Sequence, residues 1–296
     1  MVVLYIAIIM VMRVVQSYYS KQASNLIASS KTPYAKYVTM SMTFSSLFSA
    51  LIFVIMHDFS GLNAETVIIS SLSGISLAMC SLLSLRSYHY GTVVLNSVFS
   101  TAGLIIPCVA GIFVFNEPMS FIQVASIAVL LFSAYLLIGS SKEIYGTFTL
   151  KGFLLLIGTF FANGMTMFFQ KLFAHRVPDG NVSLFSFFTF FVPAVLLAIM
   201  TFIKKPQNED STDKKPFPKK LVFFAATLAF AVFVVNQLAT ISASLISSAI
   251  LFTFINGGAT IIAAIVGAIV FKERLSVKSV IGIILGVASL ICISSF

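Results

Sequence analysis

The sequence predicts an all-α integral membrane protein, in which ten transmembrane helices form two inverted five-helix repeats. Three observations lead to this fold class: the composition, the length of the apolar runs, and a motif that occurs twice. Of the 296 residues, 59% are hydrophobic and 9% are charged, and the mean hydropathy is +1.05. In soluble domains roughly a quarter of all residues are charged, so this chain has too little polar surface to cover a water-soluble globule.

The apolar residues gather in runs whose lengths suit a hydrocarbon core of ~30 Å, at ~1.5 Å per helical residue. The first half contains five such runs, at Val2–Tyr19, Tyr37–Met56, Val67–Leu85, Thr92–Phe115 and Phe121–Ile138. The second half contains five more, at Gly152–Phe169, Val182–Ile203, Leu221–Ala243, Ala249–Phe271 and Val277–Ile293. The runs are apolar on nearly all faces, which predicts helices, because the strands of a membrane barrel alternate apolar and polar residues.

A motif of the form Phe-x-Glu-x-x-Ser lies after the fourth run and at the end of the ninth. It occurs at Phe115–Ser120 and again at Phe271–Ser276, 156 residues later, and the same interval separates Gly111 from Gly267. A constant interval across a charged interruption is harder to obtain by chance than apolar similarity alone. We interpret it as an internal duplication, with repeats at residues 1–139 and 150–296.

Five crossings per repeat would bring the second repeat into the membrane from the opposite side, so the repeats are expected to be inverted. The basic residues agree with this topology. Of the 18 Lys and Arg residues, fifteen lie in connectors after odd-numbered runs, two (Lys171 and Arg176) lie after an even-numbered run, and Arg13 lies within the first run. Because cytoplasmic loops carry the excess of cations, we expect a multi-pass protein of a bacterial plasma membrane with both termini external.

Other classes of function find little support. The net charge of +9 could suggest nucleic acid, but the cations are scattered through short connectors, and we expect no such partner. Cys80, Cys108 and Cys292 lack disulfide or zinc spacing. No nucleophile–base set, metal cluster or midspan acid pair is visible, so we expect no enzyme activity, no catalytic residue, no metal and no cofactor. No GxxxxGK[ST] motif is present, which argues against ATP drive within the chain.

Arg13 is an ionisable side chain within the first run, and Gln16 lies one helical turn further on the same face. Ionisable groups in a membrane helix are costly, and they usually face protein or a water-filled cavity. Arg13 could therefore meet an anionic substrate. The alternative is that its long side chain reaches the cytoplasmic headgroups and has no role in binding.

Other polar side chains lie in the middle of the runs. Asn96 and Ser100 are four residues apart, and Asn163 and Gln170 are seven apart, so each pair shares a helix face. Asn236 with Gln237 and Asn256 lie in the eighth and ninth runs. Such residues either hydrogen-bond neighbouring helices or line a polar cavity. As a set they favour a cavity, so we predict a substrate pathway at Arg13, Gln16, Asn96, Ser100, Asn163, Gln170, Asn236 and Asn256.

Glycine and proline mark irregular or closely packed helices. Gly103, Pro107 and Gly111 in the fourth run, and Gly257–Gly258 in the ninth, indicate helices that bend or pack tightly. Gly282 and Gly286 form a GxxxG pattern in the last run. That spacing allows close helix contact, either within the chain or in a homodimer through the last helix.

The two-by-five arrangement with Phe-x-Glu-x-x-Ser before the last run of each half resembles the drug/metabolite transporter superfamily, specifically its EamA-like ten-helix members. Phe271–Ser276 followed by Ile281–Val287 is very similar to the family's signature, and Asn116–Ser120 is a looser copy. The resemblance implies a central cavity between the halves, lined by the first four helices of each repeat, with the fifth and tenth as outer support.

Together these features predict a secondary transporter that moves a small polar metabolite across the plasma membrane by alternating access. The alternative is a membrane-embedded interaction or assembly subunit without transport activity, in which the polar residues only join helices. A buried polar cavity discriminates between the two, because a transporter needs one and a scaffold does not.

Overall fold

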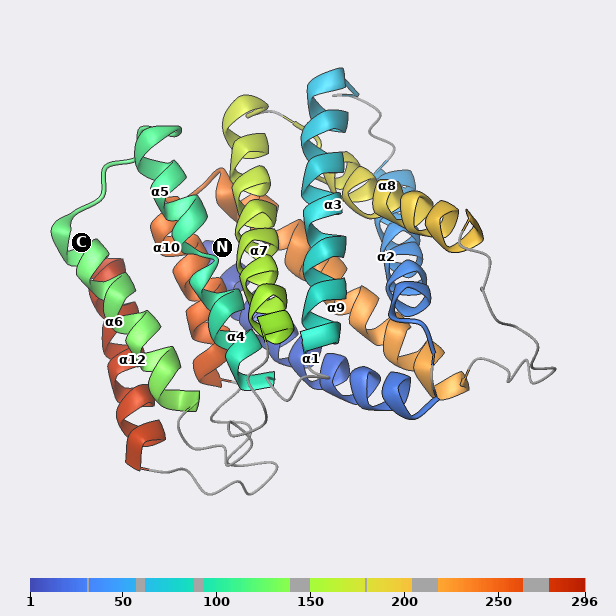
Figure 1. Ribbon diagram of the computed structural model, residues 1–296. Helices are drawn as coiled ribbons and strands as arrows, with labels where there is room; N and C mark the ends of the chain where they lie inside the picture. The colour runs from blue at the N-terminus through green and yellow to red at the C-terminus, as the bar shows by residue number, and fades with distance from the viewer. Residues whose placement is uncertain are drawn as a thin grey trace.

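The computed structural model describes residues 1–30, 32–56, 62–87, 93–138, 150–178, 180–203, 218–262 and 277–295. The regular structure in these ranges is helical, without strands (Figure 1). Six of the described helices are long and apolar enough to cross a membrane, and four shorter apolar helices accompany them. The chain is therefore an all-helical membrane protein, as the composition predicts.

The helices of the first half follow the predicted runs in order. They are α1 (Val2–Ser30), α2 (Tyr34–Met56), α3 (Ala64–Ser87), α4 (Val93–Ala102), α5 (Ile105–Phe113) and α6 (Phe121–Ile138). Those of the second half are α7 (Leu150–Arg176), α8 (Val182–Ile203), α9 (Lys219–Ala243), α10 (Ser248–Thr253), the π-helix η3 (Phe254–Gly258) and α12 (Val277–Ser295). The second copy of the motif, Phe271–Ser276, lies outside the described residues.

Two helices extend beyond the predicted runs. The run that ends at Tyr19 continues as helix to Ser30, because Ala23 and Ile27 on the polar extension are buried in the core. α7 continues past Phe169 to Arg176. Lys171 is consequently a buried residue inside a helix. The prediction that it lies in the connector after an even-numbered run was wrong.

The fourth predicted run is interrupted between α4 and α5. Pro107 has no N–H to donate to the carbonyl of Gly103, and Gly103 O instead accepts the N–H of Ile106 at 3.1 Å. Because proline removes the bond to the fourth residue before it, the helix breaks at this point. The ninth run is also irregular, with a π-helix that contains Gly257 and Gly258. Both irregularities confirm the positions predicted from glycine and proline.

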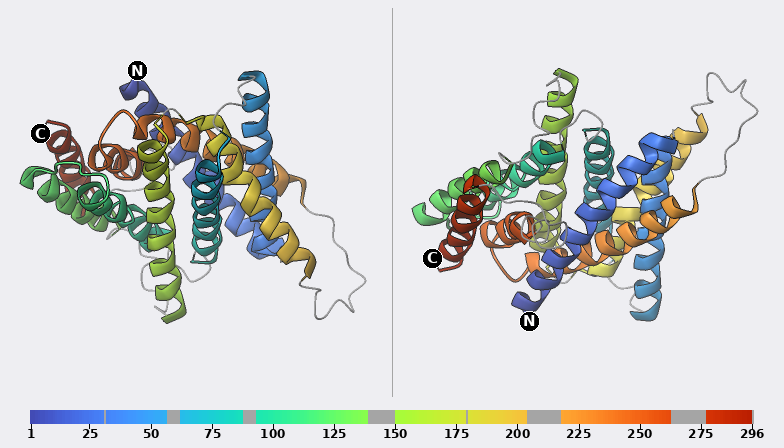
Figure 2. Two further views of the ribbon diagram at one scale, coloured as in Figure 1. Left: turned by 90° about the horizontal axis from the view of Figure 1, so that it is seen from above. Right: turned by 90° about the horizontal axis from the view of Figure 1, so that it is seen from below.

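The helices pack as pairs drawn from opposite halves of the chain. α3 lies against α7, α2 against α8, α1 against α9, and α6 against α12. α6 and α12 run side by side at one edge of the bundle in all three views (Figures 1 and 2). Their outer faces expose large apolar side chains such as Phe121, Phe132 and Ile284, which suits helices that face lipid.

The face of α12 that carries Gly282 and Gly286 packs against α6 of the same chain. Ser133 Oγ of α6 donates to the Gly282 carbonyl at 2.7 Å. A Cβ on Gly286 would lie 2.6 Å from both Ser133 Oγ and Ile261 Cδ1. A homodimer through the last helix, which stays a prediction, would therefore have to use another face of α12.

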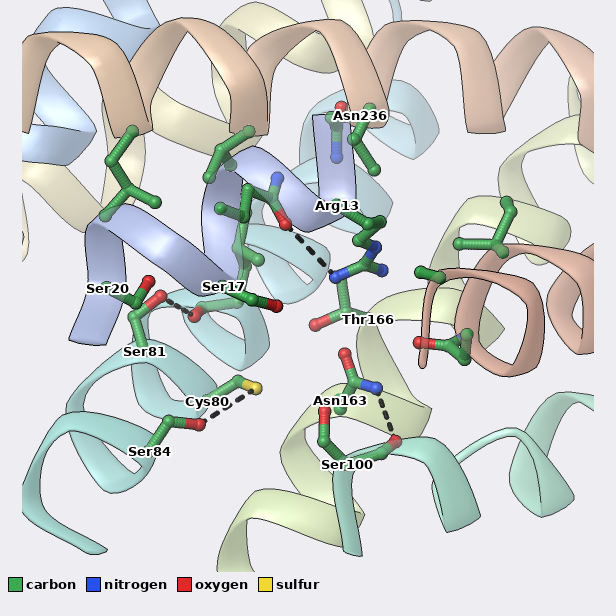
Figure 3. A pocket seen from close by; sticks show the side chains of 18 of the residues that line it. Arg13, Ser17, Ser20, Cys80, Ser81, Ser84, Ser100, Asn163, Thr166 and Asn236 are labelled. Carbon is green, nitrogen blue, oxygen red and sulfur yellow. Dashed lines mark hydrogen bonds between the residues drawn. The ribbon is translucent and has the colours of Figure 1, made fainter. Parts of the chain in front are cut away.

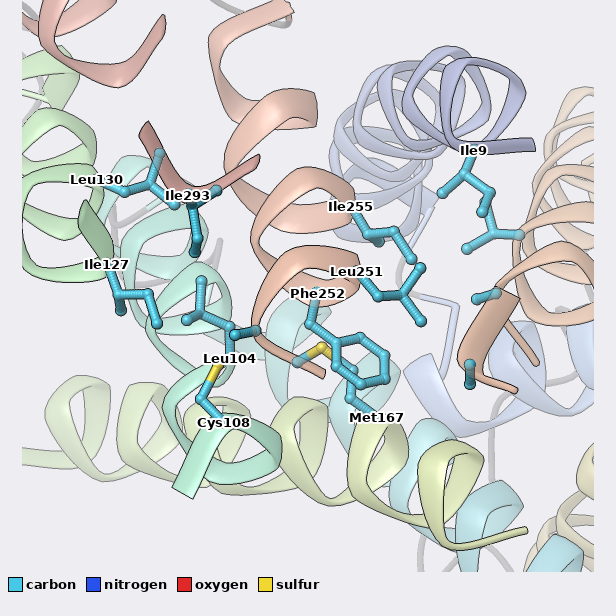
Figure 4. Packing of buried hydrophobic residues seen from close by; sticks show 14 of the residues in the cluster. Ile9, Leu104, Cys108, Ile127, Leu130, Met167, Leu251, Phe252, Ile255 and Ile293 are labelled. Carbon is cyan, nitrogen blue, oxygen red and sulfur yellow. The ribbon is translucent and has the colours of Figure 1, made fainter. Parts of the chain in front are cut away.

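Two large apolar clusters hold the bundle together. One joins α1, α5, α6, α7, α9, α10, η3 and α12 through residues such as Leu104, Met167 and Phe252 (Figure 4). The other joins α1, α2, α3, α8 and α9 around fully buried Tyr37 and Phe190. The space between these two clusters contains the candidate site.

Candidate functional site

A cavity of about 370 Å³, lined by both polar and apolar side chains, lies within the helix bundle. Its walls come from α1, α2, α3, α4, α6, α7, α9 and η3 together with the residues that follow η3. Both apolar clusters contribute to the walls, for example Met167 from one and Val38 from the other. Among the described residues that line it, Arg13 is the only charged one.

The lining residues follow helical periodicity on four helices. α1 contributes Arg13, Gln16, Ser17 and Ser20, and α7 contributes Asn163, Thr166, Met167 and Gln170. The same spacing of three, four and seven residues recurs in Val38, Ser41, Met42 and Ser45 of α2, and in Leu77, Cys80, Ser81 and Ser84 of α3. Each helix therefore turns one continuous stripe, largely of hydroxyl and amide groups, toward the cavity.

Arg13 lies in the middle of α1 with its guanidinium directed into the cavity, near Thr166 and Asn236 (Figure 3). Its Nη1 donates to Gln16 Oε1 at 3.4 Å, a long hydrogen bond. Its Nε is buried and has no hydrogen-bond partner among the described residues. A guanidinium has five N–H donors, so most of the donor capacity of Arg13 is available to a ligand.

Asn163 combines a structural contact with a place in the cavity wall. Its Nδ2 donates at 2.7 Å to the carbonyl of Ser100 (Figure 3), which lies in the last turn of α4. The same carbonyl also accepts the backbone N–H of Gly103 at 3.2 Å, so the side chain from α7 adds a second hydrogen bond at the end of this helix. The crossing is close because a Cβ on Gly164 would lie 2.6 Å from Gly103 O.

The amides of α9 connect this helix to α8. Ser186 Oγ lies 3.1 Å from Asn236 Oδ1 and 2.7 Å from Gln237 Oε1, and Gln237 Nε2 donates to Ser183 Oγ at 3.0 Å. Asn236 lines the cavity, whereas Gln237 does not. Gln237 therefore acts as a contact between helices.

Asn256 lies in the π-helix and lines the opposite wall. Its Nδ2 donates to Phe252 O at 3.1 Å and lies 3.0 Å from Met167 Sδ. Thr260, one turn further on, shares a hydrogen bond of 3.1 Å with Thr101 of α4. π-helical turns often occur at functional sites, and this one places Asn256 next to the cavity.

Of the eight predicted pathway residues, seven line this one cavity: Arg13, Gln16, Ser100, Asn163, Gln170, Asn236 and Asn256. The side chain of Asn96 lies outside the described residues. The structure thus brings together polar residues from both halves of the chain, and their role in binding stays a prediction.

Sequence reasoning missed most of the hydroxyl-bearing wall and Tyr37. Tyr37 is fully buried, and its hydroxyl has no hydrogen-bond partner among the described residues although it lines the cavity. The signal was the helical spacing of Ser17 and Ser20 with Arg13, and of Ser81 and Ser84 on α3. Serine is common in membrane helices because it can bond its own backbone, so its presence alone did not identify a site.

Comparison with known proteins identifies the class of molecule that carries this cavity. Residues 150–295 match the model of the EamA-like transporter family. The second half of the chain belongs to the EamA-like transporter family. The predicted resemblance is thereby confirmed, and the protein is a membrane transporter of the drug/metabolite class.

Two further comparisons extend over most of the chain. A Haemophilus influenzae protein, named only as uncharacterized, is 22% identical over 255 residues, which cover 81% of this chain and 82% of that protein. A crystal structure superposes with a TM-score of 0.77 at 12% identity, covering 98% of this chain and 95% of the other. At that identity the similarity concerns the fold alone. EamA-like proteins are transporters and not enzymes.

Proposed function

We propose that this protein is a secondary transporter that carries a small polar metabolite with a negatively charged group across the plasma membrane by alternating access. The observation that carries this proposal is a cavity inside an apolar helix bundle, with polar side chains from both halves and one charge, Arg13, among its described lining residues. An assembly subunit would not need such a cavity. The cavity therefore supports the transporter over the alternative of a membrane-embedded scaffold.

The cavity volume and the donors of Arg13 support the proposed substrate class. A cavity of about 370 Å³ lies at the small end of ligand pockets, which span ~300–1,000 Å³. An isolated cation in a membrane protein is costly, and the described lining residues contain no carboxylate that would neutralise Arg13. A carboxylate or phosphate group on the substrate would accept hydrogen bonds from the N–H groups of Arg13 that have no partner within the protein. In the competing account the guanidinium lies at the headgroups, a position that its place in the cavity wall does not support.

The pairing of helices supports two five-helix repeats. We compare the contacts on the assumption that α1, α2, α3, α4–α5 and α6 correspond to α7, α8, α9, α10–η3 and α12. The main contacts between the halves then have counterparts. The contact of α1 with α9 corresponds to that of α7 with α3, and the contact of α4 with α7 corresponds to that of η3 with α1. The repeats 1–139 and 150–296, with an odd number of spans each, would then be inverted.

The register of the cavity stripes adds to this support. The four lining residues of α1 are Arg13, Gln16, Ser17 and Ser20, and adding 150 to each number gives the four lining residues of α7. Arg13 thus corresponds to Asn163, so the two halves offer equivalent positions with different chemistry. An asymmetric substrate, with one charged and one neutral polar end, would suit this arrangement.

The orientation follows from the cations. With Lys171 buried in α7, the one other cation counted on this side is Arg176, the last residue of α7, which pairs with Glu65 at 2.8 Å. The cation-rich connectors would be cytoplasmic and both termini external, as in the topology expected for a bacterial plasma membrane. The partners proposed are the substrate and the lipid bilayer, with no nucleic acid.

Flux through proteoliposomes tests the function. Purified protein is reconstituted and screened for uptake of small carboxylates and phosphate esters, beside neutral and cationic analogues of the same size. We expect flux of an anion, and we expect Arg13→Gln to lower it about 10–100-fold, since a hydrogen bond to a charged group contributes ~1.5–3 kcal/mol. Arg13→Lys should retain part of the flux.

Arg176→Gln is the matched control, because it removes an arginine that is largely exposed and remote from the cavity. It should leave anion flux unchanged. Loss of flux that is equal for Arg13→Gln and Arg176→Gln, or equal flux of anionic and neutral analogues through the wild-type protein, would contradict a substrate-binding role of Arg13.

A further inference from the structure

A second buried charge, Lys171, lies next to the cavity and is fully compensated. Its Nζ lies 2.6 Å from Glu117 Oε1 and donates to the carbonyls of Ala243 at 2.8 Å and Ile246 at 3.0 Å. The other carboxylate oxygen of Glu117 accepts the backbone N–H of Ser248 at 2.9 Å. The two side chains are only 10% and 18% exposed. This pair joins the segment after α5 to α7, to the end of α9 and to the start of α10.

The first copy of the Phe-x-Glu motif is shaped to form this pair. Gly111 leaves room for the carboxylate, since a Cβ there would lie 2.9 Å from Glu117 Oε2. Asn116 has a positive φ of 52° and turns the chain after α5, a conformation that asparagine tolerates better than most residues. The backbone N–H of Glu117 then donates to Gly111 O at 2.8 Å. The motif thus has a structural reason for its glycine, its asparagine and its glutamate.

The aromatic residue of the motif packs on the same face of α7. Phe115 is buried, and its ring lies 5.9 Å from that of Phe168 and 5.3 Å from that of His175, measured between centroids. Phe168, Lys171 and His175 are spaced three and four residues apart, so they form one face. The motif covers this face with an aromatic contact on each side of the ion pair.

The ion pair lies at one end of the cavity, and the cavity extends to the opposite end of the bundle. Tyr37 is the fourth residue of α2 and Leu85 is two residues before the end of α3, so the cavity reaches nearly to these helix ends. α3 and α7 are antiparallel, because Glu65 at the start of α3 pairs with Arg176 at the end of α7. The lining of α7 stops at Gln170, directly before Lys171. The pair therefore stands beyond the closed end of the cavity.

We propose that Glu117 and Lys171 form a latch that holds this end of the cavity closed, and that the latch must break when the cavity opens on that side. The proposal rests on the proposed function, because alternating access requires each end to open in turn. Elements of both halves meet at the latch, so its rupture frees α7 and the α9–α10 connection from the end of α5. A buried pair whose partner is removed is strongly destabilised, which makes this contact suited to separate two discrete states.

Thiol accessibility tests the latch without any substrate. Cys80, Cys108 and Cys292 are replaced by Ala or Ser, and Gln170→Cys, just inside the closed end, serves as the probe. A charged, membrane-impermeant thiol reagent is applied to right-side-out and to inside-out vesicles. We expect Glu117→Gln and Lys171→Met each to raise the labelling rate from the latch side by about tenfold or more, and Lys171→Arg to raise it much less.

The exposed pair Glu65–Arg176 provides the matched control. It lies at the same end of α7, but its side chains are 42% and 62% exposed, so Arg176→Gln should leave the labelling rate unchanged. Glu117→Gln keeps an acceptor for Ser248 N–H and carries the test if Lys171→Met does not fold. Unchanged labelling in folded Glu117→Gln protein, or the same increase in Arg176→Gln, would overturn the latch.

Failure of the latch and failure of transport are distinguishable. The protein could move no anion while the latch variants still raise the labelling rate. That result would support the latch and contradict the proposed substrate. Anion flux together with an unchanged labelling rate in the latch variants would support the proposed substrate and contradict the latch. The side from which labelling rises also tests the orientation, because the end of α7 is expected to be external.

Discussion

Among the described residues, Arg13 and Lys171 are the two cations that are not exposed, and their surroundings differ sharply. Lys171 contacts a carboxylate and two backbone carbonyls, so all three of its ammonium donors have acceptors. Arg13 has one long bond to Gln16 and a buried Nε without a partner. An uncompensated charge in a membrane protein is costly. Burying Arg13 therefore lowers the stability of the fold, whereas the contacts of Lys171 offset the cost of burying its charge. This contrast indicates a structural role for Lys171 and is the reason why we propose a binding role for Arg13.

Tyr37 provides a test at the same scale. Its buried hydroxyl lines the cavity without a hydrogen-bond partner, so Tyr37→Phe removes no existing bond and should leave the unfolding temperature in detergent unchanged or slightly higher. If the hydroxyl contacts substrate, the same change should raise the KM of anion flux several-fold.

Ser45→Ala is the comparison, because Ser45 Oγ donates to Ala229 O of α9 at 3.1 Å. Loss of that contact between helices should cost about 0.6–1.7 kcal/mol and lower the unfolding temperature. A drop for Tyr37→Phe as large as that for Ser45→Ala would mean that the tyrosine is structural.

The sequence identified the rare polar residues of the site better than the common ones. Arg13 and Asn163 stand out in apolar runs, and the structure places both at the cavity. The serines did not stand out, because their hydroxyls bond the preceding turn in most membrane helices, as Ser81 does with Leu77. Lys171 was misplaced because the predicted helix ended with its apolar residues. Its charge is tolerated inside the helix only because Glu117 is nearby in space, which a linear pattern does not reveal.

At the scale of elements, the interrupted helices determine the shape of the cavity. The break before α5 exposes the carbonyl of Ser100 to Asn163, and the π-helix brings Asn256 to the opposite wall. Glycine and proline predicted where these irregularities occur, since proline removes a backbone donor. Glycine and proline could not predict which other helix would cross α4 and α5 at this break. The contact of Gly103 with Gly164 depends on tertiary packing between segments 61 residues apart in number.

This crossing gives a prediction for Gly164→Ala. The added methyl would meet Gly103 O at 2.6 Å and Ile106 Cδ1 at 2.5 Å, and a backbone carbonyl cannot rotate away. We expect a loss of stability of about 1–3 kcal/mol from overpacking, seen as a lower unfolding temperature in detergent.

Gly158→Ala makes the same substitution six residues earlier in α7. Its methyl would meet the Leu83 side chain at 2.8 Å, which can change rotamer, while alanine favours the helix by ~1 kcal/mol over glycine. The two effects should nearly cancel. Equal melting temperatures for the two variants would show that the crossing at Gly164 is looser than the structure has it.

Helix existence and order followed from the apolar runs, but helix ends did not. α1 extends eleven residues beyond Tyr19 because its polar extension packs beside the start of α2. Such tertiary contacts override the local composition from which an end is predicted. The consequence matters for function, because the longer helix puts Arg13 near its middle instead of near a headgroup region.

At the scale of the molecule, the sequence suggested two repeats and the helix pairs are compatible with them. The second copy of the motif, Phe271–Ser276, lies outside the described residues, so the structural support for two repeats comes from the pairing of helices. The position of the cavity toward one end of the bundle could not be predicted from sequence, because it depends on which residues meet at the other end in the folded structure. The ion pair of Glu117 and Lys171 supplies that information.

The most direct test of the central claim is an experimental structure of the protein with its transported anion bound. The account predicts density for the ligand in the cavity between the two apolar clusters, with its charged group within hydrogen-bond distance of the Arg13 guanidinium and its neutral part toward Asn163. The Arg13→Gln protein under the same conditions should show no ordered anion there. Ligand density outside this cavity, or an Arg13 side chain directed to the lipid headgroups while the anion is bound, would contradict the account.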